Sequence, residues 1–195
     1  TVFGRRGPPW TIGEDWRDLE AESIQHFEWG VQWAINERFS MDFSVFSSEV
    51  EDAISLVAPP PVGFIVNLGE YQNRGAEWMI RYRYNEWSVF SGVTWNENED
   101  GRPNTPEWST SVGVHWRSGN WRIAADYQYL SEQLTYNPRF GQRPQTLDAF
   151  GLLNAKIVYR VDYTESALEY YVAGENLANE TYSYRPGYPM PGTVI

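Results

Sequence analysis

Two polar segments of the sequence carry side chains with types and spacing that suit ligand binding. In the first, residues 96–101 read Asn-Glu-Asn-Glu-Asp-Gly, and a glutamate follows at position 107. Oxygen ligands therefore stand at positions 1, 3, 5 and 12 and glycine at position 6, as in the calcium-binding loop of an EF-hand. Asn96, Asn98, Asp100 and Glu107 are therefore the candidate ligands of a structural Ca²⁺ ion. A solvated acidic loop is the favoured interpretation, because asparagine replaces the usual first aspartate and two prolines stiffen the segment.

The second segment, residues 133–147, combines positive charge with aromatic rings. It contains Arg139 and Arg143 beside Tyr136 and Phe140, and it has no acidic residue, although the chain has a formal charge of −11. Guanidinium groups bind anions, and aromatic rings stack on flat ligands. These four residues are therefore the predicted ligand-binding set, for an anionic metal chelate. The alternative is that the arginines pair with carboxylates of neighbouring loops or with lipopolysaccharide phosphates.

The composition argues against several other classes of function. The chain has no cysteine, which excludes disulfides and thiolate metal sites, and its pI of about 4.6 disfavours nucleic-acid binding. We expect the two histidines, His26 and His115, to line a polar surface, with haem contact as the alternative. No Ser-His-Asp set is discernible, and the clustered carboxylates lie in an open loop, where they lack the burial that acid–base catalysis needs. We therefore expect no catalytic residue and no enzyme.

Strands with two different faces must position these segments. From residue 23 onward, apolar residues alternate with polar or small ones, the period-2 pattern of β-strands. In residues 107–117, for example, Trp108, Val112 and Trp116 share one face, while Ser111 and His115 share the other. We predict eight strands, at residues 24–35, 39–52, 64–84, 87–97, 107–117, 121–132, 148–161 and 168–177. Short turns alternate with long connections, as in an antiparallel up-and-down meander.

Tryptophans mark both ends of the apolar face. Trp87 and Trp95 are eight residues apart, as are Trp108 and Trp116. At ~3.3 Å per residue and a tilt of ~40°, this separation rises about 20 Å, close to the ~25 Å apolar band of an outer-membrane barrel. We predict that these four residues and Trp121 form girdles at the two membrane interfaces. The predicted fold is therefore all-β, a portion of a transmembrane barrel in a bacterial outer membrane.

The order of turns and loops indicates a larger barrel than eight strands. The first predicted strand ends in a short turn, so residues 1–23 form a long loop at the opposite rim. Residues 178–195 form the last loop and the start of a ninth strand. Outer-membrane barrels leave no open edge, so we expect further strands on both sides of this segment. Small residues on the polar face, such as Gly92, Ser111 and Gly113, favour a wide lumen.

Three groups of residues resemble motifs of a known family. They are Leu19-Glu20-Ala21-Glu22-Ser23 with Phe27-Glu28-Trp29-Gly30; Asn67-Leu68-Gly69-Glu70 with Arg74-Gly75-Ala76-Glu77; and Glu175-Asn176-Leu177 with Tyr182 and Pro189-Met190-Pro191-Gly192. In this order they resemble the C-terminal half of the barrel of TonB-dependent outer-membrane receptors, over nearly the whole chain. One departure is Thr193, which stands where the family usually has arginine.

The resemblance implies more than the residue pattern does. It implies a 22-stranded barrel, with an N-terminal plug and a TonB box outside this chain, that imports a ferric siderophore, haem or a cobalamin-like chelate. The expected partners are then outer-membrane lipid, lipopolysaccharide, the TonB complex acting through the plug, and a small metal chelate. No cofactor is expected beyond the Ca²⁺ ion considered above. A passive porin-like barrel and a soluble β-sandwich that binds carbohydrate remain the alternatives.

Overall fold

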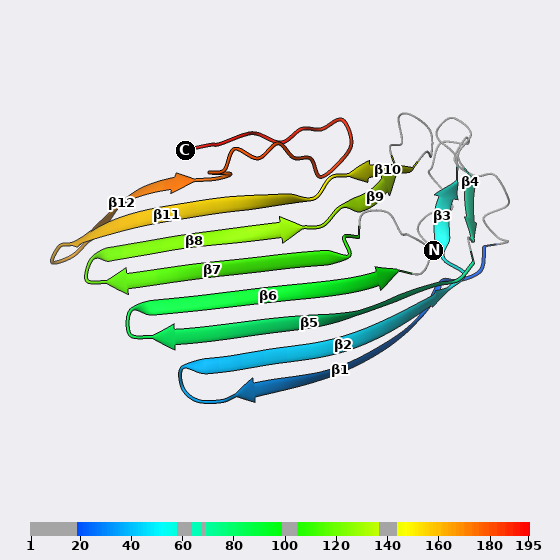
Figure 1. Cartoon of the computed structure of the whole chain (residues 1–195), viewed down its shortest axis with the longest axis horizontal. Coiled ribbons are helices and arrows are strands. Elements are labelled where there is room, and N and C mark those ends of the chain that lie inside the picture. Colours follow the sequence, from blue (N-terminus) through cyan, green and yellow to red (C-terminus); the bar gives the residue numbers. More distant parts are fainter. Residues whose placement is uncertain (1–18, 58–63, 68, 99–104, 137–143) are drawn as a thin grey trace.

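The computed structural model describes residues 19–57, 64–67, 69–98, 105–136 and 144–195. Its main feature is one antiparallel sheet of eight long strands (Figure 1). The strands are β1 (Ser23–Ala34), β2 (Phe39–Glu51), β5 (Tyr71–Tyr84), β6 (Trp87–Asn98), β7 (Trp108–Ser118), β8 (Trp121–Leu130), β11 (Phe150–Asp162) and β12 (Ala167–Gly174). Each pairs with the next long strand along the chain, so the predicted all-β meander is confirmed.

The alternation in the sequence gives this sheet two different faces. Trp87 lies opposite Trp116 in the next strand, and one residue further along each strand Ser88 lies opposite His115. The same phase continues into the following strand, where Trp116 lies opposite Ile123. Because side chains alternate between faces, this register collects apolar residues on one face and polar residues on the other. We call these the apolar face and the polar face.

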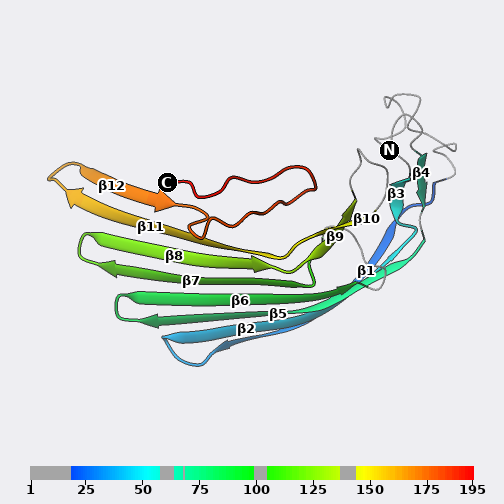
Figure 2. The same ribbon diagram turned by 45° about the horizontal axis from the view of Figure 1, so that its top comes forward.

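Two long connections contain short strands that the sequence analysis did not predict. β3 (Ile54–Val57) pairs with β4 (Phe64–Asn67), and β9 (Gln133–Tyr136) pairs with β10 (Pro144–Leu147). The prediction of one strand over 64–84 is therefore wrong. β4 and β5 are separated at Gly69, whose φ of 87° is a conformation that glycine adopts without strain. Figures 1 and 2 show both hairpins at the same end of the sheet, which we call the loop end.

Tight turns join the strands at the opposite end, which we call the short-turn end. Asn85 and Gly119 have φ values of 50° and 54°, the left-handed conformation that two-residue hairpin turns require. In the turn after β1, Asn36 Oδ1 accepts hydrogen bonds from the amides of Arg38 and Phe39, at 2.9 and 3.0 Å. Such turns fix the register of each strand pair, and so they fix which side chains share a face.

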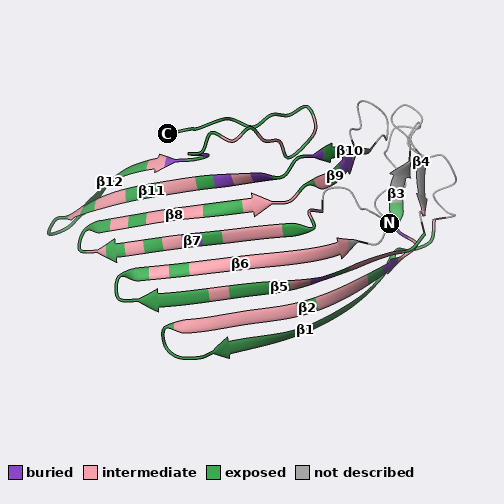
Figure 3. Cartoon of the chain, in the orientation of Figure 1, coloured by how far each residue is buried: buried purple, intermediate pink, exposed green. Residues whose placement is uncertain are grey.

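The buried apolar residues lie near the loop end and not along the centre of the sheet. Among the described residues they are Val50, Ala53, Leu147, Phe150 and Leu152. Trp29, Trp78 and Trp87 are by contrast 53 %, 50 % and 49 % exposed, and Figure 3 shows how much of the sheet is exposed away from the loop end. A soluble sandwich would bury such residues against a second sheet, and the described part of the chain holds no sheet large enough to do so.

None of the described ranges contains a helix that is long and apolar enough to cross a membrane.

Residues 175–195 return along the sheet beyond β12 (Figure 1). Glu175 and Val194 form an isolated antiparallel bridge, with backbone hydrogen bonds of 2.9 and 3.1 Å. Residues 176–193 are therefore a loop whose two ends meet. The bridge lies where a ninth strand would pair with β12, and the ninth strand itself stays a prediction.

Candidate functional site

The apolar face carries aromatic side chains at both of its ends. Trp87 packs beside Trp116 near the short-turn end, and Trp95 beside Trp108 near the loop end, with ring centroids 6.2 and 6.5 Å apart. Trp121, close to the turn between β7 and β8, lies 4.7 Å from the ring of its β11 neighbour Tyr159. The five predicted girdle residues therefore form two rows on one face. Their contact with a membrane interface stays a prediction.

Charged groups begin where this aromatic band ends. Two residues beyond Trp95, the Glu97 carboxylate accepts a hydrogen bond from Nε of Arg74 at 2.7 Å. At the short-turn end, the Arg38 guanidinium lies 5.2 Å from the centroid of the Tyr84 ring. Long cationic side chains and aromatic rings of this kind are typical of the border between an apolar layer and water. The apolar face therefore has a bounded width and does not continue into the loops.

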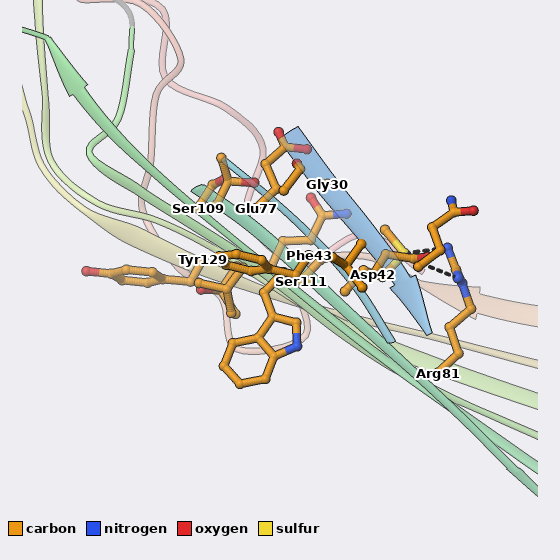
Figure 4. A pocket seen from close by; sticks show the side chains of 18 of the residues that line it. Gly30, Asp42, Phe43, Glu77, Arg81, Ser109, Ser111 and Tyr129 are labelled. Carbon is orange, nitrogen blue, oxygen red and sulfur yellow. Dashed lines mark hydrogen bonds and ion pairs between the residues drawn. The ribbon is translucent and has the colours of Figure 1, made fainter. Parts of the chain in front are cut away.

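The polar face holds a groove of about 490 Å³ that extends from β1 to β8. Small residues, among them Gly30, Ser109 and Ser111, lie along it, and Glu77 and Asp42 add carboxylates (Figure 4). Asp42 is neutralised by Arg81, whose Nη1 lies 2.6 Å from its Oδ2. Glu77 has no ion-pair partner within the described residues. We call this the acidic groove.

Some glycines of the polar face serve packing within the sheet and do not widen the lumen. Phe90 of β6 lies over Gly113 of β7, and Phe46 of β2 lies over Gly75 of β5. A Cβ atom at either glycine would overlap the phenyl ring. Gly113 thus lies on the polar face, as the alternation predicts, but its small size accommodates the Phe90 ring. Gly92, by contrast, does lie on the acidic groove.

A second groove, of about 400 Å³, lies on the polar face near the short-turn end. Its lining comes from β7, β8, β11 and β12 and includes Arg117, Arg122 and Lys156 but only one carboxylate, that of Glu169. Glu169 forms ion pairs with Arg122 and with Arg160, whose Nη1 lies 3.5 Å away. We call this the basic groove. The two grooves of one face thus differ in the sign of their charge.

The predicted ligand-binding set falls mostly outside the described part of the chain. Arg139, Phe140, Arg143 and the side chain of Tyr136 lie outside the described residues. The structure does bring the ends of their segment together, because Gln133 lies opposite Leu147 in the β9–β10 hairpin. Binding by these four residues stays a prediction.

Two of the predicted calcium ligands, Asn96 and Glu107, lie at the base of the β6–β7 connection. Asp100 and the side chain of Asn98 lie outside the described residues. The backbone amide of Asn96 donates to the backbone carbonyl of Glu107 at 2.8 Å, and the Glu107 carboxylate accepts from the Trp108 indole at 3.2 Å. In the part of the chain that the structure describes, no three His, Asp or Glu side chains gather as a metal site. The Ca²⁺ ion stays a prediction.

The two histidines lie on the polar face, in the phase that the sequence predicts. His26 Nδ1 lies 2.8 Å from Ser48 Oγ, and its Nε2 lies 3.7 Å from the Glu28 carboxylate. Sequence spacing did not predict this row of serine, histidine and glutamate. All three side chains lie on the open surface of two strands, and His26 and Glu28 are 50 % and 57 % exposed, unlike the buried carboxylate of a hydrolytic triad. His115 packs edge-on against Phe90 at 5.9 Å.

Asn176 has a structural role that the sequence pattern did not indicate. Its side chain donates to the carbonyls of Glu180 and Pro191, at 2.9 and 3.2 Å, and accepts from the Glu180 amide at 2.8 Å. Its own amide donates to Asn154, which donates in turn to Asp126 of β8. Asn176 is only 3 % exposed. It therefore clamps the loop 176–193 and ties it to the polar face.

Asn67 has a similar role at the other long connection. Its side chain bonds the amide and the carbonyl of Glu20, both at 3.0 Å, and the carbonyl of Asp52 at 2.6 Å. Nearby, Glu22 Oε2 accepts from the amide of Ile54 at 3.1 Å. The signal was present in the sequence, since Glu20, Glu22, Asn67 and Asn176 belong to the motifs quoted above. Spacing alone did not say which backbone groups they would bond.

An aromatic cluster holds the last loop against the sheet. Phe150 lies 4.8 Å from the ring of Tyr182 and 5.4 Å from that of Tyr184. Partial burial, with the neighbouring Tyr182 as a second cause, raises the pKa of the Tyr184 hydroxyl above its usual range. The phenol is therefore neutral at physiological pH.

The comparisons with solved structures give the same architecture. The chain superposes on the FrpB iron transporter from Neisseria meningitidis (F3-3 variant) with a TM-score of 0.71 and 17 % identity, over 94 % of this chain and 30 % of that one. For the copper transporter OprC the TM-score is 0.75 and the identity 14 %, over 92 % and 31 %. For the ferric-catecholate import receptor Fiu from K12 E. coli, closed form, the values are 0.69 and 17 %, over 96 % and 28 %.

The chain thus spans about 30 % of the length of these structures, and at such identities the likeness shows the fold. No curated protein matches the chain in sequence. A family model does match: residues 3–177 fit the one described as TonB dependent receptor-like, beta-barrel. With a match over most of its length, a meander of eight antiparallel strands and one apolar and one polar face, the chain belongs to the TonB-dependent receptor β-barrel family.

Proposed function

We propose that this chain forms part of the wall and of the external loops of an outer-membrane importer, which takes up a scarce metal chelate with energy from the TonB complex. The observation that carries the proposal is the pair of faces on one sheet. An exposed apolar face ends in aromatic rows, and the opposite face is grooved, polar and lined by small residues. A wall between lipid and a wide lumen needs this combination.

The membrane explains why so many large side chains are exposed. In hydrocarbon, an apolar face needs no second sheet, and backbone groups are satisfied by their neighbours in the sheet. The two edges of the sheet, β1 and β12, would pair with further strands of the same barrel. The short-turn end would then face the periplasm, and the loop end, with its two hairpins and the clamped loop 176–193, would face outward.

The proposed substrate is a small metal chelate. The similar structures include an iron transporter, a copper transporter and a ferric-catecholate import receptor, which supports a metal complex as the class of substrate. Within this chain, Tyr136, Arg139, Phe140 and Arg143 are the residues that we propose to contact an anionic chelate. The choice among siderophore, haem and cobalamin-like ligands requires a direct measurement.

Uptake by the full-length protein would test the proposal. The protein would be produced in a Gram-negative host that lacks its own ferric-siderophore receptors, and uptake of radiolabelled ferric siderophores and haem would be measured. The proposal expects saturable uptake of at least one chelate, which stops when TonB is deleted. The test variant has Arg139 and Arg143 replaced by glutamine. It should reach the outer membrane in the same amount as the protein with both arginines, and it should lose most uptake.

The two rival functions give different results in the same experiment. A passive porin-like barrel would pass solutes at a rate proportional to their concentration, whether or not TonB is present. A soluble carbohydrate-binding sandwich would be recovered as a monomer without detergent, would melt cooperatively there, and would not fractionate with the outer membrane. Either result would overturn the proposal.

A further inference from the structure

Residues 184–188 form the turn at the far end of the last loop, and we call them the loop tip. An antiparallel bridge between Ser183 and Pro189 closes the tip at its base. Within it, the Tyr188 amide donates to the Arg185 carbonyl at 3.1 Å. Proline and glycine stand between these two residues, and the glycine has a φ of 78°, as in a type II turn. The conformation of the tip is therefore set before any ligand binds.

Packing and hydrogen bonds hold the loop tip at a defined place. The ring of Tyr184 lies 5.4 Å from that of Phe150, which is 4 % exposed, and the Asn176 clamp fixes the base of the loop. Phe150 is the first residue of β11, directly after the β9–β10 hairpin in the chain. Figures 1 and 2 both show the far end of the loop 176–193 beside β10. The loop tip therefore lies next to the hairpin whose sequence includes the predicted ligand-binding arginines.

The loop tip presents an arginine that the fold does not explain. Arg185 is exposed, and no carboxylate in the described part of the chain forms an ion pair with it. That includes Glu180 in the same loop and Asp148 just before β11. The tyrosines at the two ends of the tip, Tyr184 and Tyr188, are 44 % and 51 % exposed. A type II turn favours proline and glycine at its centre but requires no arginine at its first residue.

We propose that the loop tip determines which chelate binds, with Arg185 contacting the anionic oxygens of a ring-bearing metal chelate and the two tyrosines contacting its rings. This inference rests on the proposed function and names the chemistry that it selects. Guanidinium groups bind anionic oxygens through paired hydrogen bonds, and aromatic rings pack on flat ligands. Ferric catecholate complexes and haem are anionic and have flat rings, whereas a ferric hydroxamate complex is uncharged and has none.

The fixed turn makes such a contact effective. A ligand that binds a mobile loop must first order it, and that cost lowers the affinity. Here the bridge at the base, the proline of the turn and the packing on Phe150 have already ordered the backbone. Binding then orders little more than the arginine side chain itself. We therefore expect selection between chelates to depend on Arg185 more than on the shape of the loop.

Affinity measurements with three probes test the proposal. Full-length protein in outer membranes from a host without TonB would be titrated with a radiolabelled ferric catecholate, haem and a ferric hydroxamate. We expect the tightest binding for one of the two ring-bearing anions. Arg185→Gln should raise its Kd on the order of tenfold, the loss of one charge-assisted hydrogen bond, and should leave any hydroxamate binding unchanged. Arg185→Lys should give a smaller loss, because it keeps the charge but not the paired donors.

The matched control is Arg74→Gln, which removes an arginine at the same end of the sheet but beside the apolar face, and it should leave every Kd unchanged. Heat-modifiable migration on a gel shows that each variant is folded. An unchanged Kd in Arg185→Gln would overturn the proposal, as would an equal loss for charged and uncharged probes or binding of the hydroxamate alone.

Uptake in cells that contain TonB separates this inference from the function on which it rests. Tight binding that Arg185→Gln weakens, without TonB-dependent uptake, contradicts the proposed function alone. TonB-dependent uptake with a Kd that Arg185→Gln leaves unchanged contradicts the role of the loop tip alone. Binding of none of the three probes contradicts both.

Discussion

The apolar and polar faces of the same strands are both open to the surroundings, yet their side chains differ completely. On β7, Trp108 and Val112 are 44 % and 40 % exposed, while their neighbours Ser109 and Ser111 line the acidic groove. Exposure alone therefore does not say what a face contacts. The difference lies in the kind of surroundings: exposed tryptophan and valine suit lipid, whereas serine and glycine beside carboxylates suit water or a polar partner.

The largest effect in this comparison should come from placing a charge on the apolar face. Val112→Arg lies midway between the tryptophans of β7, and we expect it to lower the free energy of unfolding by ~2–4 kcal/mol, the cost of arginine near the midplane. The measurement is a denaturant titration of the full-length protein in lipid vesicles. The control is Ser111→Arg, one residue away on the polar face, which should cost less than about 1 kcal/mol because water reaches it. Equal losses at the two positions would contradict the assignment of the faces.

A smaller loss of stability is expected when Asn176, which clamps the last loop, is replaced. Asn176→Ala removes three side-chain hydrogen bonds at a buried position, and leaving such backbone groups unpaired costs about 1–3 kcal/mol. The loop 176–193 should then be cut by protease before the sheet is. Asn179→Ala is the matched control, because Asn179 also has a positive φ but accepts only one bond, from the Thr193 amide at 3.2 Å. Equal protease sensitivity in the two variants would show that Asn176 is not the clamp.

Replacing a glycine that lies beneath a phenyl ring should lower the stability of the barrel, and a second substitution that removes the ring should abolish this loss of stability. Gly113→Ala forces a Cβ into the Phe90 ring, which we expect to cost about 1–2 kcal/mol as overpacking. In a Phe90→Ala background the same change should cost close to nothing, because the ring is gone. A double-mutant cycle on the full-length barrel measures this coupling. Additive losses would mean that the ring does not restrict residue 113.

Much of the fold follows from the sequence because a period of two residues fixes which side chains share a face. The pairing of Trp87 with Trp116 and of Trp95 with Trp108 needs only that alternation and the length of the turns. The β3–β4 and β9–β10 hairpins were missed because each strand has four residues, too few for a periodic signal among prolines. The break at Gly69 was missed because apolar residues continue on both sides of it.

The site was harder to predict than the fold. Its charges come from strands far apart in the sequence: Arg122 and Glu169 are 47 residues apart, and no local motif joins them. The role of Asn67 and Asn176 depends on backbone groups in other segments, which a motif cannot specify. The contact of Gly113 with Phe90 was not predictable, because a small residue looks the same in a sequence whether it faces a lumen or an aromatic ring.

The smallest expected effect is that of calcium on the loop between β6 and β7. If Asn96, Asn98, Asp100 and Glu107 bind Ca²⁺, millimolar calcium should raise the melting temperature of the full-length protein by a few degrees at most, since about 1 kcal/mol moves it by ~2–4 °C. Asp100→Asn should remove the shift, and magnesium at the same concentration should not reproduce it. No shift at millimolar calcium would establish the solvated acidic loop instead.

The most direct test of the account is to measure which residues of β7 face lipid. Single spin labels would be placed at each position from 108 to 116 of the full-length protein in vesicles. Their collision rates with oxygen, which is concentrated in lipid, and with a water-soluble nickel complex would then be compared. The account predicts that oxygen access is high at even positions and nickel access at odd positions, alternating along the strand, except at Gly113, where Phe90 covers the backbone. High nickel access at Val112 and its even-numbered neighbours, or no alternation, would contradict the claim that this sheet is the wall of a membrane barrel.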